Sequence, residues 1–455
     1  MRPPWTCGAL ALLLIVGRPA SPQAVRPEAL SLDEAVAKAV KESPRMSKAR
    51  ADELRSAATV KAARSGLMPK IGVAETFTES TDPVFAFGAR LRQGRFGAAD
   101  FSPDRLNYPA PTADYMSSAE ATWTVFDSGR TGAQIAAART ALKANEQQTA
   151  AASQDLAFAA VREYYRALLS DQQKVAMEAA VARAQSFAKQ AHDRVDAGLA
   201  LIADGMQADV ELSQRKQEQA EAESNHLLAC ADLAGVLGDP TKTYTLIAPT
   251  GTPSELTRPL EDLQRTSLET RPDLASARSQ IEAAQFGVKA GHRAYGPQVS
   301  TFANVQADNP RPLGGGNDNW TAGAKIEMQI FEGGARRADV DTANAQLEAA
   351  RAMYREAETK AILEVKKAFF ARQNAARQYG TSGEMLKQVE ETLNTASDRY
   401  GAGLVTVTDV LRQQEQLRDV ELTRAQSLYQ WWIADAQLRL STGTMKLGAA
   451  VGVHQ

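Results

Sequence analysis

The chain has 455 residues, and its 52 lysines and arginines nearly balance its 54 aspartates and glutamates, giving a formal net charge of −2. This balance excludes the strong field that would favour nucleic acid or an acidic partner. Aromatic residues make up only 6% of the sequence, and alanine supplies much of the apolar share. Because alanine buries little area, the composition favours long paired helices over a thick globular core.

Residues 1–24 are predicted to be a signal peptide. Arg2 supplies a positive start, residues 9–16 form a short apolar run, and residues 22–24 end in an alanine suited to cleavage. The alternative is a transmembrane anchor, but a run of roughly eight residues is far shorter than the ~20 that a spanning helix needs. No other segment is apolar enough for such a helix, so insertion into a membrane would have to use strands.

The rest of the chain is internally duplicated. Residues 126–129 (Phe-Asp-Ser-Gly) match residues 331–334 (Phe-Glu-Gly-Gly), which lie 205 positions later. Upstream the spacing becomes 228, as the pair Pro44 and Pro272 shows, so the first half carries 23 more residues than the second. A register that holds over more than a hundred positions indicates two copies of one structural unit.

The duplication predicts two repeats, at 25–238 and 259–443. A connector at 239–258, rich in proline, threonine and glycine, is expected to be irregular, and a tail follows at 444–455. Each repeat has the same predicted order, which is a helix, two strands, a long helix and a shorter returning helix.

The first helix of each repeat is predicted as a single element. In the first half it begins at Ser31, which forms a capping box with Glu34, and it ends near Gly66. Its counterpart is expected to begin around Pro259 and to end near Gly296.

The alternation of apolar and polar residues predicts two β-hairpins. Segments 115–125 and 320–331 place apolar side chains on one face and polar ones on the other, whereas their partners at 70–80 and 298–308 alternate less well. The predicted apolar face comprises Tyr115, Ala119, Ala121, Trp123, Val125, Trp320, Ala322, Ala324, Ile326, Met328 and Ile330. A sheet of this kind meets oil on one side and water on the other.

The extra residues of the first half are expected in the outer loop at 82–111. Its prolines exclude regular strand pairing, and its aromatic residues indicate a loop that packs on itself or on neighbouring copies. Arg90, Arg92 and Arg95 are candidates to meet anionic lipid, although a solvated charged loop is the simpler interpretation.

One very long helix dominates each half. No proline interrupts residues 131–195 or 336–400, and at 1.5 Å per residue each segment would form a rod of about 100 Å. Apolar residues at three-four spacing, such as Leu386, Val389 and Leu393, predict coiled-coil pairing. The returning helices are expected at 204–237 and 409–440.

Four strands per chain cannot close a barrel, and open strand edges in lipid cost several kcal/mol for each unpaired peptide group. Three copies would supply twelve strands, enough for a water-filled lumen. The predicted fold is therefore mainly α with membrane β: a long coiled-coil α-helical tunnel, plus four β-strands per protomer contributing to a 12-stranded trimeric barrel.

These features resemble the TolC-like outer membrane factors. The resemblance rests on the order of the elements, on Phe-Asp-Ser-Gly before the first rod, and on the pattern Arg-x3-Gly-Leu-x4-Asp at 194–204 and 399–409. It implies a homotrimer whose barrel lies in outer membrane lipid and whose tunnel lies in the periplasm. Its expected partners are a periplasmic adaptor (a membrane fusion protein) and an inner membrane transporter, with the trimer acting as the exit duct of a tripartite efflux system.

The resemblance also implies roles for residues at the periplasmic end of the tunnel. Tyr400 with Asp204 would form the gate, and we expect the tyrosine hydroxyl to donate a hydrogen bond to that carboxylate, while Asp409 would line an acidic ring. The implied adaptor-docking residues are Arg194, Gly198, Leu199, Arg399, Gly403 and Leu404. Two departures, Val405 at the position of a gate arginine and Arg412 at that of a second acidic residue, indicate a weaker or differently charged gate.

A plainer interpretation exists for the same tip residues. Glycine with alanine makes the turn that any helical hairpin needs, and an aspartate at the start of a returning helix caps it. Both roles can hold together, but a bare turn does not require arginine before it and aspartate after it at the same spacing twice.

The sequence gives no support for catalysis, a metal or a cofactor. Its four histidines lack metal-ligand spacing, and the glycines at 314–316 belong to a hairpin loop rather than a phosphate cradle. Two alternatives to an efflux duct remain. One is the outer membrane component of type I protein secretion, which would use the same tunnel. The other is a periplasmic coiled-coil scaffold without a pore, which the apolar strand faces argue against.

Overall fold

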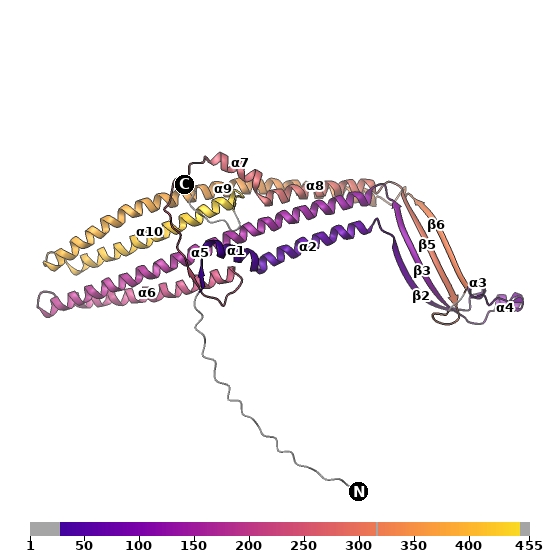
Figure 1. The fold of residues 1–455 in the computed structure, drawn as a ribbon, viewed down its shortest axis with the longest axis horizontal. Coiled ribbons are helices and arrows are strands. Elements are labelled where there is room, and N and C mark those ends of the chain that lie inside the picture. The colour runs from indigo at the N-terminus through magenta and orange to yellow at the C-terminus, as the bar shows by residue number, and fades with distance from the viewer. Residues whose placement is uncertain (1–27, 315–316, 446–455) are drawn as a thin grey trace, which may run out of the picture.

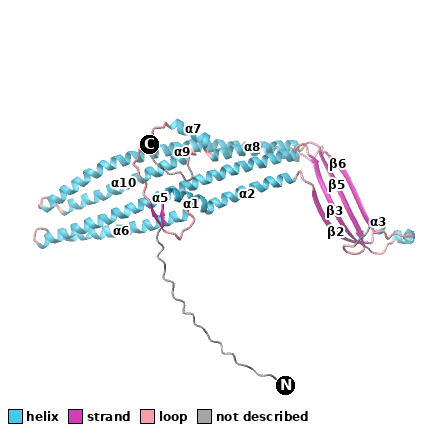
Figure 2. Ribbon diagram, viewed as in Figure 1, coloured by secondary structure: helices cyan, strands magenta, loops and turns pink. Residues whose placement is uncertain are grey.

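The computed structural model describes residues 28–314 and 317–445. The predicted signal peptide, two glycines of the 314–316 loop and most of the predicted tail lie outside the described residues. Figure 1 shows an elongated molecule, in which a body of long helices carries a four-stranded sheet at one end and two helical hairpin tips at the other. Figure 2 shows the long strands gathered at one end of the helical body, with a short strand pair beside the body itself and short helices at the far end of the sheet.

The first predicted helix of each repeat is in fact two helices. In the first half these are α1 (Leu32–Glu42) and α2 (Pro44–Ser65), and in the second α7 (Leu260–Thr270) and α8 (Pro272–Arg293). The break has one cause, since a residue before proline is excluded from helical geometry. Ser43 and Arg271 are accordingly extended, with ψ of 135° and 123°. The predicted capping box of Ser31 and Glu34 is confirmed.

Four strands form one antiparallel sheet in the order β2-β3-β5-β6. They are β2 (Lys70–Ser80), β3 (Thr112–Phe126), β5 (Gln298–Asn309) and β6 (Asn317–Glu327). The two predicted hairpins are confirmed. The extension of the last strand to residue 331 was wrong, because Glu327 already pairs with Gln298, the first residue of β5, and leaves later residues no partner.

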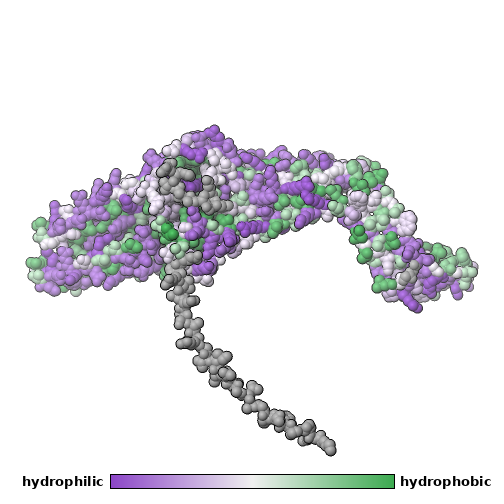
Figure 3. Space-filling view, viewed as in Figure 1, coloured by the Kyte–Doolittle hydropathy of each residue, from purple (hydrophilic) through white to green (hydrophobic). Residues whose placement is uncertain are grey.

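The register of the sheet separates an apolar face from a polar one. Neighbouring rows on the apolar face are Ile71, Ala121, Ala303, Ala322 and Val73, Ala119, Val305, Trp320. Rows on the opposite face are Gly72, Glu120, Asn304, Thr321 and Ala74, Ser118, Gln306, Asn319. After Thr124 the register shifts, so that Phe126 pairs with Val299 and Val125 lies at a bulge without a partner of its own. Hydrophobic surface covers much of the sheet in Figure 3.

The long helices match their predictions closely. The rods α5 (Arg130–Asp196) and α9 (Ala335–Gly401) have 67 residues each. The returning helices α6 (Ile202–Val236) and α10 (Val407–Ser441) have 35 residues each. Figure 1 shows the α5–α6 and α9–α10 hairpins running side by side. In the described residues, none of the helices combines the length and the apolar character needed to cross a membrane.

The largest core lies midway along the body. Tyr165 stacks on Trp432 with ring centroids 5.8 Å apart, and fully buried Tyr164 lies beside it. The Tyr164 hydroxyl accepts a hydrogen bond of 3.0 Å from the Ile247 backbone N–H, next to the connector strand β4 (Tyr244–Leu246). Because β4 pairs in parallel with β1 (Glu28–Leu30), the connector is not wholly irregular and is tied to the start of the described chain.

Candidate functional site at the helical tips

The two tips are built from the same backbone motif. At the end of α5, Leu199 N–H donates to the Arg194 carbonyl at 2.8 Å and Gly198 N–H to the Val195 carbonyl at 2.9 Å. At the end of α9 the same pair of bonds runs from Leu404 to Arg399 and from Gly403 to Tyr400. This is the Schellman arrangement, which places the residue after the helix in left-handed geometry. Gly198 and Gly403 have φ of +71° and +76°, a region that glycine alone enters freely.

The two aspartates predicted to act at the gate both cap returning helices. An Asp204 carboxylate oxygen accepts from the Leu201 N–H at 3.1 Å. Asp409 forms a reciprocal box with Thr406, accepting from its hydroxyl at 2.7 Å and from its N–H at 3.0 Å. The hydrogen bonds from Thr406 hold the pKa of Asp409 below its ordinary value. The capping interpretation of these residues is therefore confirmed, and the second carboxylate oxygen of Asp409 lies 3.8 Å from Arg412.

Tyr400 lies in an apolar cluster shared by the two hairpins. It is only 4% exposed, and its ring centroid lies 5.2 Å from that of Phe187. The predicted hydrogen bond between Tyr400 and Asp204 is absent, because the Asp204 carboxylate is turned to the cap and the Tyr400 hydroxyl has no partner. Burial raises the pKa of Tyr400; the Arg194 charge lowers it and the more distant Asp204 charge raises it.

Arg194 crosses from the first tip to the second. Its Nη1 donates to the Gly401 carbonyl at 2.8 Å, and its guanidinium carbon lies 5.0 Å from the centre of the Tyr400 ring. Its counterpart Arg399 is exposed and lines a groove between α9 and α10 with Asp409. The resemblance implied the same role for both arginines and gave no sign of this difference. The available signal was the following residue, which is Val195 in one copy and Tyr400 in the other.

Ion pairs join the hairpins farther from the tips. Arg183 of α5 holds Glu421 of α10 through two contacts of 2.8 and 3.3 Å. Arg418 of α10 lies 3.1 Å from Glu218 of α6. Glu218 also meets Arg215, which is buried. Sequence spacing gives no signal for the two pairs that join different hairpins, since their residues lie 238 and 200 positions apart.

At the opposite end of the molecule, the predicted outer loop folds into a small cap. It contains α3 (Pro83–Arg92), a 3-10 turn (Ala98–Phe101) and α4 (Pro103–Asn107). Two of its prolines, Pro83 and Pro103, lie at the first helical positions, where no N–H is needed, so they start helices as well as excluding strands. The expected packing of the loop on itself is confirmed.

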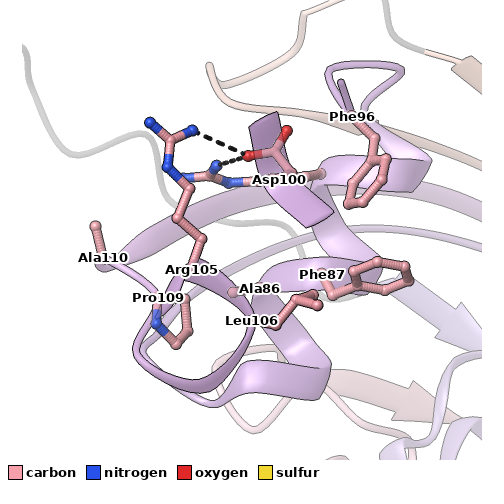
Figure 4. Close-up of a pocket in the computed structure, with 9 residues that line it drawn as sticks. Ala86, Phe87, Phe96, Asp100, Arg105, Leu106, Pro109 and Ala110 are labelled. Carbon is pink, nitrogen blue, oxygen red and sulfur yellow. Dashed lines mark hydrogen bonds and ion pairs between the residues drawn. The ribbon is translucent and has the colours of Figure 1, made fainter. Parts of the chain in front are cut away.

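Aromatic and charged contacts hold the cap together. The Phe96 ring lies 4.6 Å from that of Phe87 and 5.0 Å from that of Phe101. Figure 4 shows Phe87 and Phe96 around the same pocket as Asp100, whose carboxylate Arg90 and Arg105 contact at 2.6 and 3.5 Å.

The cap is also fixed to the sheet. Arg92 pairs with buried Asp308 at 3.3 Å, and Gln93 donates to Asp114 at 2.8 Å. Two of the three arginines considered for lipid, Arg90 and Arg92, therefore already hold carboxylates of this chain. Arg95 is exposed.

The described residues, 28–314 and 317–445, contain no group of three or more His, Cys, Asp or Glu side chains arranged to hold a metal ion. The histidine nearest to the tips, His192, instead contacts Asp209 at 2.9 Å.

Comparisons with known proteins give a consistent result. The sequence model of a family described as "Outer membrane efflux protein" matches residues 35–239 and 263–444. The solvent efflux pump outer membrane protein SrpC of Pseudomonas putida is 29% identical over 153 residues, which are 33% of this chain and 33% of that protein. The pyoverdine export outer membrane protein OpmQ of Pseudomonas aeruginosa is 28% identical over 346 residues, which are 71% of this chain and 66% of OpmQ.

The solved structures agree on the fold. The Campylobacter jejuni CmeC outer membrane channel superposes with a TM-score of 0.78 at 17% identity, covering 91% of this chain and 86% of that one. The fold is thus that of an outer membrane channel protomer.

Proposed function

The chain belongs to the outer membrane efflux protein family, and from that premise we propose that it is the exit duct of a tripartite efflux system. One observation carries the proposal. A sheet with one apolar face and two unpaired edge strands, β2 and β6, continues directly into two long helical hairpins. Such a sheet needs lipid on one side and a further strand at each edge.

Those needs are met by a homotrimer in the outer membrane. Three copies of the sheet, joined β6 to β2, give a closed twelve-stranded barrel whose polar face lines a lumen. The six hairpins then continue as a helical tunnel into the periplasm. At 1.5 Å per residue, the 67 residues of each rod span about 100 Å.

The tips are the proposed docking surface for a periplasmic adaptor, which links the duct to an inner membrane transporter. Leu199 and Leu404 project there with 68% and 74% of their surface exposed. Gly198 and Gly403 beside them have no side chain to hinder a close approach. The proposed docking set also includes the exposed Arg399.

The proposed gate lies at the same end, formed by Tyr400 with Asp204 and Asp409. The carboxylates of the two aspartates would give the constriction its negative charge, and Arg412, 3.8 Å from Asp409, would reduce that charge. The proposed cargo is small organic molecules, in keeping with the names of the solvent and pyoverdine exporters among the relatives.

The decisive experiment combines size and conductance. The protein purified in detergent should have the mass of three copies and should form channels in planar lipid bilayers. A scaffold without a pore would instead stay soluble and monodisperse after the detergent is removed, and it would leave bilayers sealed. That result would exclude the duct.

A further inference from the structure

We propose that the cap holds a binding site for a small dissolved aromatic anion, in a cavity that is lined by Phe87 of α3 and by Arg105 of α4. This site lies at the opposite end of the molecule from the tips and the proposed gate. Ligand binding there goes beyond the proposed duct function, because it can be measured whether or not the protein conducts.

The cap is larger than a connection between two strands requires. Residues 81–111 join β2 to β3, whereas residues 310–316 join the equivalent strands of the second repeat, β5 and β6. A much shorter connection thus suffices to close a hairpin of this sheet. Long connections with helices of their own are often the functional parts of a fold, since a rigid scaffold positions them. The additional length of the first repeat therefore calls for a role other than joining strands.

A cavity of about 240 Å³ lies within the cap. Figure 4 shows side chains from α3, the 3-10 turn and α4 around it. Phe87, Phe96, Leu106 and Pro109 supply its apolar lining. Sites for drug-sized ligands usually measure roughly 300–1,000 Å³. This cavity is smaller, so it suits a molecule of one or two rings.

The charged groups of the cavity favour an anion. Two guanidiniums, those of Arg90 and Arg105, line it together with a single carboxylate, that of Asp100. Asp100 Oδ1 contacts both arginines, and its Oδ2 accepts a hydrogen bond of 2.9 Å from the Gly97 N–H. That backbone bond is the main cause that holds the pKa of Asp100 below its ordinary value. One carboxylate cannot neutralise two guanidiniums, so the lining keeps an excess positive charge.

Arg105 is the arginine that is available to a ligand. Its Nη1 lies 3.5 Å from Asp100, beyond the usual length of such a bond, and its side chain is 59% exposed. Arg90 contacts the same oxygen at 2.6 Å and is 33% exposed, so it can hold Asp100 by itself. A guanidinium binds a carboxylate through two parallel hydrogen bonds, and the neighbouring rings suit an aromatic body. The cavity therefore fits an aromatic carboxylate.

The cap is attached to the polar face of the sheet. Arg92 and Gln93 hold Asp308 and Asp114, and both of these aspartates lie on the same face as Gln306 and the other polar rows. The apolar face, which needs lipid, is the opposite one. We therefore expect the ligand to be a dissolved anion that enters from water, rather than the headgroup of a lipid.

The test uses 2-naphthoate and its uncharged analogue 2-naphthamide as probes. Each is titrated by calorimetry into the purified full-length protein in detergent, with a reference titration into detergent alone. We expect saturable binding of 2-naphthoate at one molecule per protomer, at least about tenfold tighter than that of the amide, as a charge-assisted hydrogen bond implies. Equal affinities for the two probes would show that the positive charge has no part in binding and would overturn the proposal.

Variants of the cap assign the binding to this cavity. Arg105→Ala should remove the difference in affinity between the two probes. Arg95→Ala is the matched control, because Arg95 is an exposed arginine of the same cap that does not line the cavity, and it should keep the full difference. Arg105→Lys retains the charge without the planar fork and should keep part of it. If Arg95→Ala and Arg105→Ala lower the affinity for 2-naphthoate equally, the cap attracts anions without a defined site and the proposal is wrong.

A third position tests the cavity without changing any charge. Ala110 lines the cavity and is exposed, so Ala110→Phe places a ring at its rim and should weaken the binding of both probes. This variant also decides the matter if Arg105→Ala disturbs the cap. Unchanged binding of both probes to Ala110→Phe would show that they bind elsewhere.

The remaining outcomes separate this site from a lipid site and from the duct. Displacement of 2-naphthoate by vesicles of anionic phospholipid would assign the arginines to a lipid headgroup and would overturn the dissolved ligand. If the protein conducts in bilayers but binds no 2-naphthoate saturably, the site is wrong and the duct stands. If 2-naphthoate binds as expected and the bilayers stay sealed, the site stands and the proposed duct fails.

Discussion

The two repeats share a backbone and differ in what their side chains do with it. Both tips close with the same pair of hydrogen bonds and a glycine of positive φ. One tip supplies an arginine that reaches across, and the other supplies the tyrosine and the carbonyl that receive it. The two copies thus share the backbone of the tips, whereas the contacts between the tips depend on positions at which the two copies have different residues.

The same divergence occurs at the middle of the body. Asp435 of α10 accepts a bond of 2.7 Å from buried Arg372. At the spacing of 205 residues, their counterparts in the first repeat are Cys230 and Ala167. The second repeat therefore has a buried ion pair at positions where the first repeat has small uncharged residues. Variants of the two copies show which features belong to the shared scaffold and which to one half.

The largest effect is expected where the copies are alike. Gly198→Leu and Gly403→Leu should each abolish export while trimers still assemble, because a side chain strains the left-handed turn and blocks close approach to the tip. The measurement is accumulation of a transported dye in cells, with trimers checked on native gels. Normal export by both variants would show that docking occurs elsewhere.

A smaller effect is expected on the free energy of unfolding, where equivalent positions of the two copies should differ. Asp435→Ala leaves the Arg372 charge buried without its carboxylate, which costs about 3–5 kcal/mol. Cys230→Ala, at the equivalent and half-buried position, should cost under about 1.5 kcal/mol, typical of a small change in side-chain volume. Thermal unfolding of the helices, followed by circular dichroism, measures both. Similar unfolding temperatures would show that Arg372 is held by Ser254 and Trp431 rather than by Asp435.

Features set by local sequence could be predicted, and they account for most of the fold. The strand predicted at 70–80 as the hairpin partner of 115–125 has the observed bounds of β2, and the absence of proline placed α5 and α9 within one residue at each end. The helix breaks before Pro44 and Pro272 also had a local signal, because a residue before proline disfavours helical geometry. The two prolines were interpreted only as evidence of the internal repeat, so each pair of helices was predicted as one.

Contacts between the halves could not be predicted in the same way. Whether Arg194 reaches Gly401 depends on how two rods some two hundred positions apart are rotated about their axes. A change of one position in the helix would turn the side chain by about 100°. The expected bond from Tyr400 to Asp204 failed for this reason: sequence placed the residues at the same height, but the Asp204 carboxylate faces its own helix cap.

The smallest expected effect concerns the caps, where the second copy has an advantage that the first lacks. Thr406 and Asp409 cap α10 reciprocally, whereas Leu201, at the position of Thr406, gives α6 no hydroxyl. Thr406→Ala should destabilise the tip of α10 by about 1 kcal/mol, and Leu201→Thr should stabilise that of α6 by a similar amount. Hydrogen exchange of the first-turn amides measures each tip separately.

This difference between the caps should also depend on pH. Because the Thr406 bonds lower the pKa of Asp409 in the folded protein, they stabilise the tip fully above its ordinary value of 3.8. That contribution should fade as the pH falls below 3.8 and through the lowered pKa. Protection of α10 amides should therefore decline in acid in the unmodified protein and less so in Thr406→Ala, which has already lost the box. Equal acid sensitivity in the two proteins would mean that Asp409 is stabilised by its position at the helix N-terminus and not by Thr406.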